Sequence, residues 1–149
     1  MRKTIALVIA LIGALTTFAG PTVASSAQPV SMTLAEPLLQ DCSVAIGFCG
    51  SGEVIPLGHA TETLDLVAGT RTLILANGSI VLAEELTDLA CPGKCFSQSH
   101  RIPPVSGQLT DTVIGGSGAY AGASGTLTGS VQAAGLVHVV MLSGSLHLP

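Results

Sequence analysis

The chain is poor in aromatic and charged residues. Aromatic residues make up 3% of its 149 residues, charged residues make up 9%, and tryptophan is absent. Binding that depends on stacked or caged rings therefore has few side chains to use. Basic residues are the scarcest charges, with five Lys and Arg against nine Asp and Glu. Because an acidic surface repels phosphate groups, the composition argues against nucleic acid as a partner.

Hydrophobic residues are abundant, at 48% of the chain. A disordered chain has far fewer, so the composition predicts a folded protein.

The N-terminus has the pattern of a secretory signal peptide. Arg2 and Lys3 precede an apolar run over residues 5–15, and small residues follow at 24–27. The run is shorter than the about 20 residues that span a bilayer, which argues against an uncleaved anchor. We therefore expect residues 1–27 to be a signal peptide, cleaved after Ala24 or Ala27, and the protein to be secreted with no membrane attachment. Cleavage leaves three basic and nine acidic residues, a formal charge of 3 − 9 = −6.

The remaining chain has the length of one domain. Residues 28–41 contain Pro29 and Pro37 and little alternation, so we interpret them as a flexible N-terminal tail. Residues 42–149 are the expected β-barrel domain.

Four cysteines in a chain expected to be exported predict two disulfides. Nearness in sequence favours the local pairs Cys42–Cys49 and Cys91–Cys95. Crossed pairs remain an alternative, because loop entropy differs by only about 1 kcal/mol per bridge and does not decide the pairing. The spacings of six and three residues, with no histidine beside them, argue against a zinc site. We therefore expect no bound metal.

Alternation of apolar and polar residues with a period of two predicts strands from Ser43 onward. Thr126, Thr128 and Gln132 alternate with Leu127 and Val131, as in a strand with one wet face. Asn77-Gly78 between two such runs predicts a hairpin with a type I′ turn. The predicted strands cover residues 43–48, 53–57, 59–67, 71–76, 79–87, 108–114, 125–133 and 137–148.

Eight short strands with glycine-rich turns suit an eight-stranded antiparallel β-barrel, because closure removes exposed sheet edges. A sandwich of two sheets is the alternative. No helical period appears after the signal segment.

Residues 114–129 hold six of the 18 glycines and predict a sharp corner between two strands. Their sequence resembles the Gly-Gly-Ser/Thr-Gly-x-aromatic-x-Gly-Ala-x-Gly signature of the allene oxide cyclase-like and dirigent-like β-barrels, with Tyr120 in the aromatic position. A hairpin like residues 70–79 occurs in secreted bacterial members. The resemblance implies a closed barrel, and it carries over no catalytic residue.

Few residues suggest chemistry. Gly116-x-Gly118-x-x-Ala121 matches a dinucleotide fingerprint, but that motif needs a βαβ unit, so we expect no cofactor. The histidines are scattered, which gives little support for a metal site, and His138 is a weaker functional candidate than Glu62. Glu62 shares a face with Ala60, Leu64 and Leu66 and points into the barrel if that face is inward. A buried carboxylate of this kind has a raised pKa and suits proton transfer or the fixing of a ligand's polar end.

Three functions fit these features. The first is the binding of a small apolar molecule in the lumen of the barrel, with Glu62 as the candidate ligand-binding residue. The second is an isomerase or cyclase that acts on a hydrophobic substrate, which requires a buried ionisable group. The third is a structural or surface-interaction protein with a solid barrel, and the low charge then makes a homo-oligomer plausible. Whether the protein is an enzyme stays open at this stage.

Overall fold

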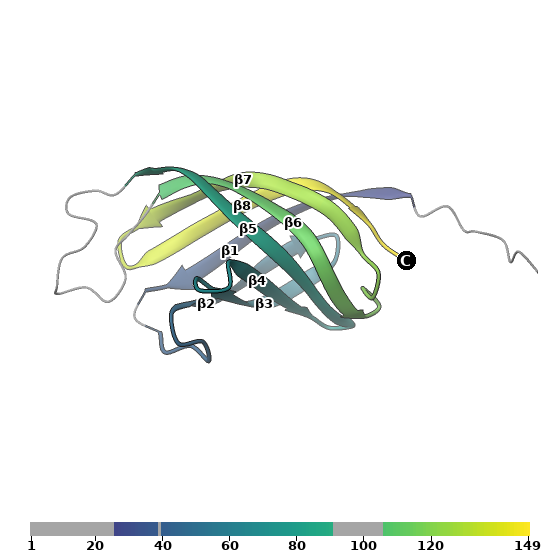
Figure 1. Ribbon diagram of the computed structural model, residues 1–149, viewed down its shortest axis with the longest axis horizontal. Helices are drawn as coiled ribbons and strands as arrows, with labels where there is room; N and C mark the ends of the chain where they lie inside the picture. The colour runs from purple at the N-terminus through teal and green to yellow at the C-terminus, as the bar shows by residue number, and fades with distance from the viewer. Residues whose placement is uncertain (1–25, 39, 91–105) are drawn as a thin grey trace, which may run out of the picture.

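The computed structural model describes residues 26–38, 40–90 and 106–149. These residues form eight strands in one sheet (Figure 1). The strands are β1 (Ala27–Pro37), β2 (Gly47–Ile55), β3 (Gly58–Asp65), β4 (Thr70–Leu75), β5 (Gly78–Ala90), β6 (Ser106–Gly118), β7 (Ser124–Ala134) and β8 (Val137–His147). The described residues contain no helix, and hence none that could cross a bilayer.

The sheet closes into a barrel in which every strand pairs antiparallel with its neighbours in sequence. The first and last strands complete the closure, with Val30 opposite Gly144 and Glu36 opposite His138. The predicted all-β, closed, eight-stranded antiparallel barrel is confirmed, and the alternative of a two-sheet sandwich is wrong.

Successive side chains of a strand alternate between the interior and the outer surface. Leu127 and Val131 are buried while Thr126 and Thr128 are exposed, as their alternation predicts. Buried aliphatic side chains from all eight strands form one core, to which Tyr120 also belongs.

The two ends of the barrel differ. One end carries the connections β1–β2, β3–β4, β5–β6 and β7–β8, and we call it the loop end. The other carries the short turns β2–β3 and β4–β5 and the glycine-rich β6–β7 connection, and we call it the corner end.

The glycine-rich segment forms the predicted corner between β6 and β7. Gly118 and Gly122 have φ of +60° and +89°, which side chains disfavour. An added Cβ at Gly116 would lie 2.3 Å from the carbonyl oxygen of Tyr120, so the chain folds tightly back on itself. The corner closes over the buried ring of Tyr120.

The predicted hairpin between β4 and β5 is confirmed, but its turn is shifted by one residue. Leu75 pairs with Gly78, so the turn residues are Ala76 and Asn77. Gly78 has a positive φ of +148°. Asn77 does not have the positive φ that the predicted type I′ turn requires.

The interpretation of residues 28–41 as a flexible tail is wrong for most of that segment. Residues 27–37 form β1, which pairs along its whole length with β8 and over five residues with β2. The predicted strand at 43–48 does not form separately, since β2 begins only at Gly47. The predicted signal peptide covers residues 1–27. Residues 1–25 of it lie outside the described residues.

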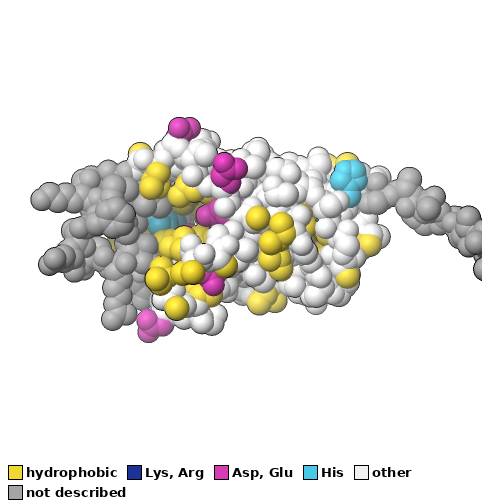
Figure 2. Space-filling model, viewed as in Figure 1, with side chains coloured by type: hydrophobic (Ala, Val, Ile, Leu, Met, Phe, Trp, Pro, Cys, Tyr) yellow, Lys and Arg dark blue, Asp and Glu magenta, His cyan; other side chains and the backbone are white. Residues whose placement is uncertain are grey.

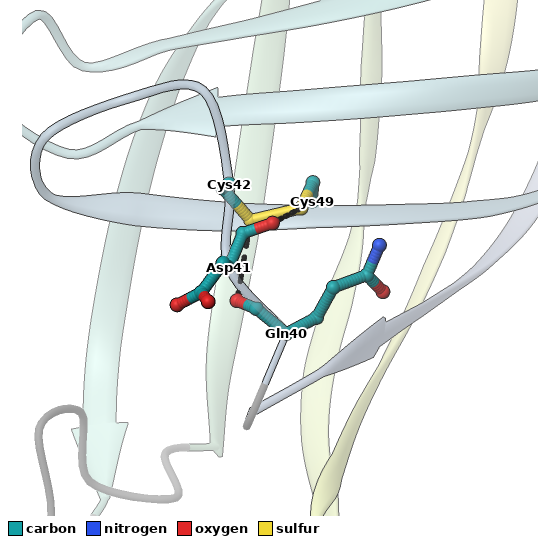
Figure 3. Close-up of a disulfide and its surroundings, with 4 residues drawn as sticks. All are labelled: Gln40, Asp41, Cys42 and Cys49. Atoms are coloured by element: carbon teal, nitrogen blue, oxygen red, sulfur yellow. Dashed lines mark hydrogen bonds between the residues drawn. A yellow bond between two sulfur atoms is a disulfide. The ribbon is translucent and has the colours of Figure 1, made fainter.

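Cys42 and Cys49 form a disulfide with a Cα–Cα distance of 5.6 Å, as the local pairing predicts. The bond closes the segment between β1 and β2 at the loop end (Figure 3). Each sulfur lies 3.7 Å from a backbone carbonyl oxygen, of Gln40 and Asp41 respectively. Cys91 and Cys95 lie outside the described residues.

Candidate functional site

A charged cluster lies inside the barrel, toward the loop end. Its centre is Arg71, the second residue of β4, whose side chain is 1% exposed. Four carboxyl groups surround the guanidinium, and each comes from a different strand. They belong to Glu36 (β1), Glu62 (β3), Glu84 (β5) and Asp111 (β6).

Arg71 donates hydrogen bonds to all four acidic residues. Its Nη1 lies 2.8 Å from Glu36 Oε1 and also contacts Glu62 Oε2. Its Nη2 contacts Glu84 Oε2, and its Nε lies 3.2 Å from Asp111 Oδ2. A planar guanidinium with five N–H donors suits such a multiply bonded position.

The sheet register explains why these residues meet. Glu84 on β5 lies directly opposite Asp111 on β6, and Glu36 lies directly opposite His138. Glu62 lies opposite Gly50 on β2, where an added Cβ would come 2.8 Å from Glu62 Oε1. The missing side chain at Gly50 therefore makes room for the Glu62 carboxyl group.

Glu62 and Glu36 have opposite pKa shifts. Burial raises the pKa of Glu62 to about 8; the charge of Arg71 opposes this shift and the carboxylate of Glu36 adds to it. Burial also acts to raise the pKa of Glu36, but the hydrogen bond with His138 and the charge of Arg71 outweigh it and lower that pKa. At neutral pH a protonated Glu62 therefore lies beside an ionised Glu36.

Asp111 is shifted in the same direction as Glu62. Burial raises its pKa to about 6 against the charge of Arg71, and the carboxylates of Glu84 and Glu36 contribute. Burial acts to lower the pKa of Arg71, but the surrounding carboxylates hold that pKa well above its ordinary value. The guanidinium thus stays charged while the acids titrate around it.

Two carboxyl oxygens in the cluster have no hydrogen-bond partner among the described residues. They are Glu62 Oε1 and Asp111 Oδ1, and both are fully buried. Buried polar atoms in folded proteins nearly always have a partner, so such atoms mark a place for a donor. The cluster has more acceptors than the guanidinium can satisfy.

Phe48 and His138 lie beside the cluster. Their rings meet edge to face with centroids 4.7 Å apart, and His138 Nδ1 lies 3.4 Å from Glu36 Oε2. Phe48 and Leu64, which are paired neighbours on β2 and β3, are buried closer to the loop end than Glu62 is. Apolar side chains therefore lie between the charged groups and that end.

The structure places the sequence candidates as follows. Glu62 points inward together with Ala60 and Leu64, as their shared face predicts. Leu66 does not, because β3 ends at Asp65 and Leu66 is 44% exposed. His138 is fully buried, as are Val140 and Leu142 on its face.

Sequence reasoning missed the partners of Glu62. Glu84 belongs to an acidic run that suggests a solvated strand end, yet its side chain is only 9% exposed and contacts Arg71. Glu36 was overlooked because it falls in the segment interpreted as a tail. Arg71 and Asp111 each lie two residues from aliphatic residues on the same face of their strands, and this signal is present in the sequence.

No family model, curated protein or solved structure that was compared with this chain matches it. Within the three described ranges, no group of three His, Cys, Asp or Glu is arranged to hold a metal ion. The argument about function therefore depends on the cluster itself.

Proposed function

We propose that this protein is a secreted β-barrel that binds a small, mainly apolar molecule at the loop end of its interior, where Glu62 fixes the polar group of that molecule. The observation that carries the proposal is the buried Glu62 Oε1, which has no hydrogen-bond partner among the residues that the structure describes. A ligand group that forms a hydrogen bond with this oxygen would remove the cost of burying it without a partner.

The position of the ligand follows from how the interior is filled. Toward the corner end, buried aliphatic side chains and Tyr120 pack against one another as a single core. The charged cluster and the apolar pair Phe48 and Leu64 lie nearer the loop end than most of that core, although Leu109 is buried on the loop side of Asp111. This end thus combines apolar surface with a few polar groups, which is the usual composition of a small-molecule site.

Secretion and the family relationship are part of the same proposal. The N-terminal sequence pattern supports export, and a disulfide between Cys42 and Cys49 suits an oxidising compartment. The glycine-rich signature around Tyr120, together with a closed barrel of eight strands, supports a relationship to the allene oxide cyclase-like barrels. Fold analogy does not by itself assign a role.

An isomerase or cyclase is the second candidate, and one observation favours it. Glu62, with its pKa raised to about 8, is protonated at neutral pH next to the ionised Glu36. A carboxyl group in that state can donate a proton to an oxygen or a carbon of a bound substrate. Conversion of a bound molecule by the wild-type protein, and not by Glu62→Gln, would distinguish catalysis from binding.

The test is native mass spectrometry of the protein from the culture medium of its own host, followed by extraction of the bound material. We expect an added mass from a small apolar molecule, and its loss in Glu62→Gln. Glu53→Gln is the matched control, because Glu53 is exposed and its side chain pairs with His59 at the surface. Wild-type protein whose mass is that of the chain alone, and which binds no apolar probe, would refute binding and favour the solid, self-associating barrel.

A further inference from the structure

Exposed aliphatic side chains form a rim around the loop end. The rim consists of Ile46, Leu66, Val67, Leu89 and Leu136, which are between 44% and 76% exposed. They come from the start of β2, the β3–β4 turn, the end of β5 and the β7–β8 turn. The Leu66 amide donates to the Ile46 carbonyl at 3.0 Å, so these two residues lie side by side.

The charges beside this rim are all negative among the residues that the structure describes. Asp41, Asp65 and Asp88 occupy the same connections and strand ends, and Glu85 lies on the exposed face of β5. The one basic residue in the described ranges is Arg71, which is buried and bonded to four carboxyl groups. Figure 2 shows hydrophobic and acidic side chains together in this half of the visible face, and Lys94 and Arg101 fall outside the described residues.

The interior behind the rim has the same imbalance. Four carboxyl groups face one guanidinium, and Glu62 Oε1 and Asp111 Oδ1 lack donors. Surface and interior therefore both offer acceptors and negative charge next to aliphatic surface. A molecule with an apolar body and a positively charged, hydrogen-donating head complements both features.

We infer that the ligand of the loop end is a small cationic amphiphile, whose aliphatic part contacts the rim and whose ammonium group donates to Glu62. This inference rests on the proposed function and adds the chemical class of the head group. An anionic amphiphile, such as a fatty acid, would place its carboxylate beside the ionised Glu36 and is disfavoured.

Binding of a cation at Glu62 has a consequence for protons. Because burial raises the pKa of Glu62 to about 8, the free protein holds a proton there at neutral pH. An ammonium group next to the carboxyl group favours its ionised form, so binding releases this proton to the solvent. The other ionisable groups that surround Glu62 and its partner Arg71 are Glu36 on β1, Glu84 on β5, Asp111 on β6 and His138 on β8.

The experiment is titration calorimetry of the purified protein with three decyl probes below their micelle concentrations: decylammonium, decanol and decanoate. We expect decylammonium to bind about tenfold more tightly than decanol, because one charge-assisted hydrogen bond accounts for a difference in affinity of that size. Decanoate should bind most weakly. Repeating the decylammonium titration at pH 7 in buffers of different ionisation enthalpy should show the release of a proton.

Two pairs of variants separate the contribution of the head group to probe affinity from the contribution of the rim. Glu62→Gln should abolish the proton release and most of the preference for ammonium, whereas Glu53→Gln should change neither. Val67→Ser should weaken all three probes alike, whereas Ile55→Ser, at another exposed site at the corner end, should not. Decanol or decanoate binding as tightly as decylammonium would overturn the cationic head group and leave apolar binding intact. Failure of all three probes would overturn the proposed function as well.

Discussion

Glu62→Gln should change how the stability of the barrel depends on pH. The pKa of Glu62 is raised from 4.5 to about 8 on folding, so the folded state holds its proton more tightly than the unfolded state. The stabilising contribution is therefore fully present below pH 4.5 and is lost as the pH rises toward 8. Between pH 6 and pH 8 the loss from this residue is about 2 kcal/mol, at about 1.4 kcal/mol per unit.

The window from pH 6 to pH 8 isolates this residue from two others in the cluster. Asp111, with its pKa raised to about 6, loses its contribution mainly below pH 6. Glu36 has a lowered pKa, so its stabilising contribution is lost only as the pH falls below its ordinary value of 4.5. A domain of this size changes its Tm by roughly 4 °C per kcal/mol, which gives a fall of roughly 8 °C for the wild type over this window.

The assay is thermal unfolding followed by circular dichroism at half-unit pH steps. Glutamine has the size of a protonated glutamate and can still accept from Arg71, so Glu62→Gln should show a flat Tm over this window and exceed the wild type at pH 8. Glu53→Gln, at an exposed position, should keep the wild-type slope. A wild-type Tm that is constant or rises from pH 6 to pH 8, or a Glu62→Gln variant that retains the slope, would refute the buried, protonated state of Glu62.

Three further changes test the packing around the cluster. Arg71→Met leaves buried carboxyl groups without their cation and should cost about 3–5 kcal/mol at pH 8, with a smaller loss at pH 5, as measured by chemical denaturation. Replacing Cys42 and Cys49 together by serine should cost about 2 kcal/mol, because their loop is short, and the variant and the wild type should be equally stable when both are measured under reducing conditions. Gly129→Ala should cost about 1–3 kcal/mol, since its Cβ would lie 1.8 Å from the Met141 carbonyl oxygen, whereas Gly115→Ala has open space and should be neutral. Equal Tm values for the two glycine variants would contradict the close strand approach.

The barrel could be predicted because strand alternation is a local signal. Leu127 and Val131 show their burial by the residues on either side of them, and the glycine-rich segment marks its own corner. The strand that was not predicted is β1, although Met32 and Leu34 alternate with polar neighbours there. Pro29 and Pro37 suggested a linker, but both lie near the ends of β1, where proline is tolerated because fewer ladder hydrogen bonds are needed.

The candidate site could be predicted only in part because its bonds join distant positions. Glu62 is detectable from its own strand, since its inward face is otherwise apolar. Its bond to Arg71 spans nine residues, whereas the bonds of Arg71 to Glu36 and Asp111 span 35 and 40. These pairs depend on the sheet register and on closure of β1 against β8, which a single sequence does not specify. Strand alternation finds inward charges, and only the closed barrel shows which of them meet.

The charged cluster is a costly feature for a barrel that only had to be stable. Well-packed aliphatic residues often replace a buried ion pair with no loss of stability, and the corner end of this interior is filled in that way. Four acids around one arginine add a further cost, because Glu62 and Asp111 each have one buried oxygen without a donor. This charged cluster lies toward the loop end of the interior, behind the exposed aliphatic rim and its acidic neighbours. This asymmetry between two ends of one barrel is the strongest reason to look for the ligand at the loop end.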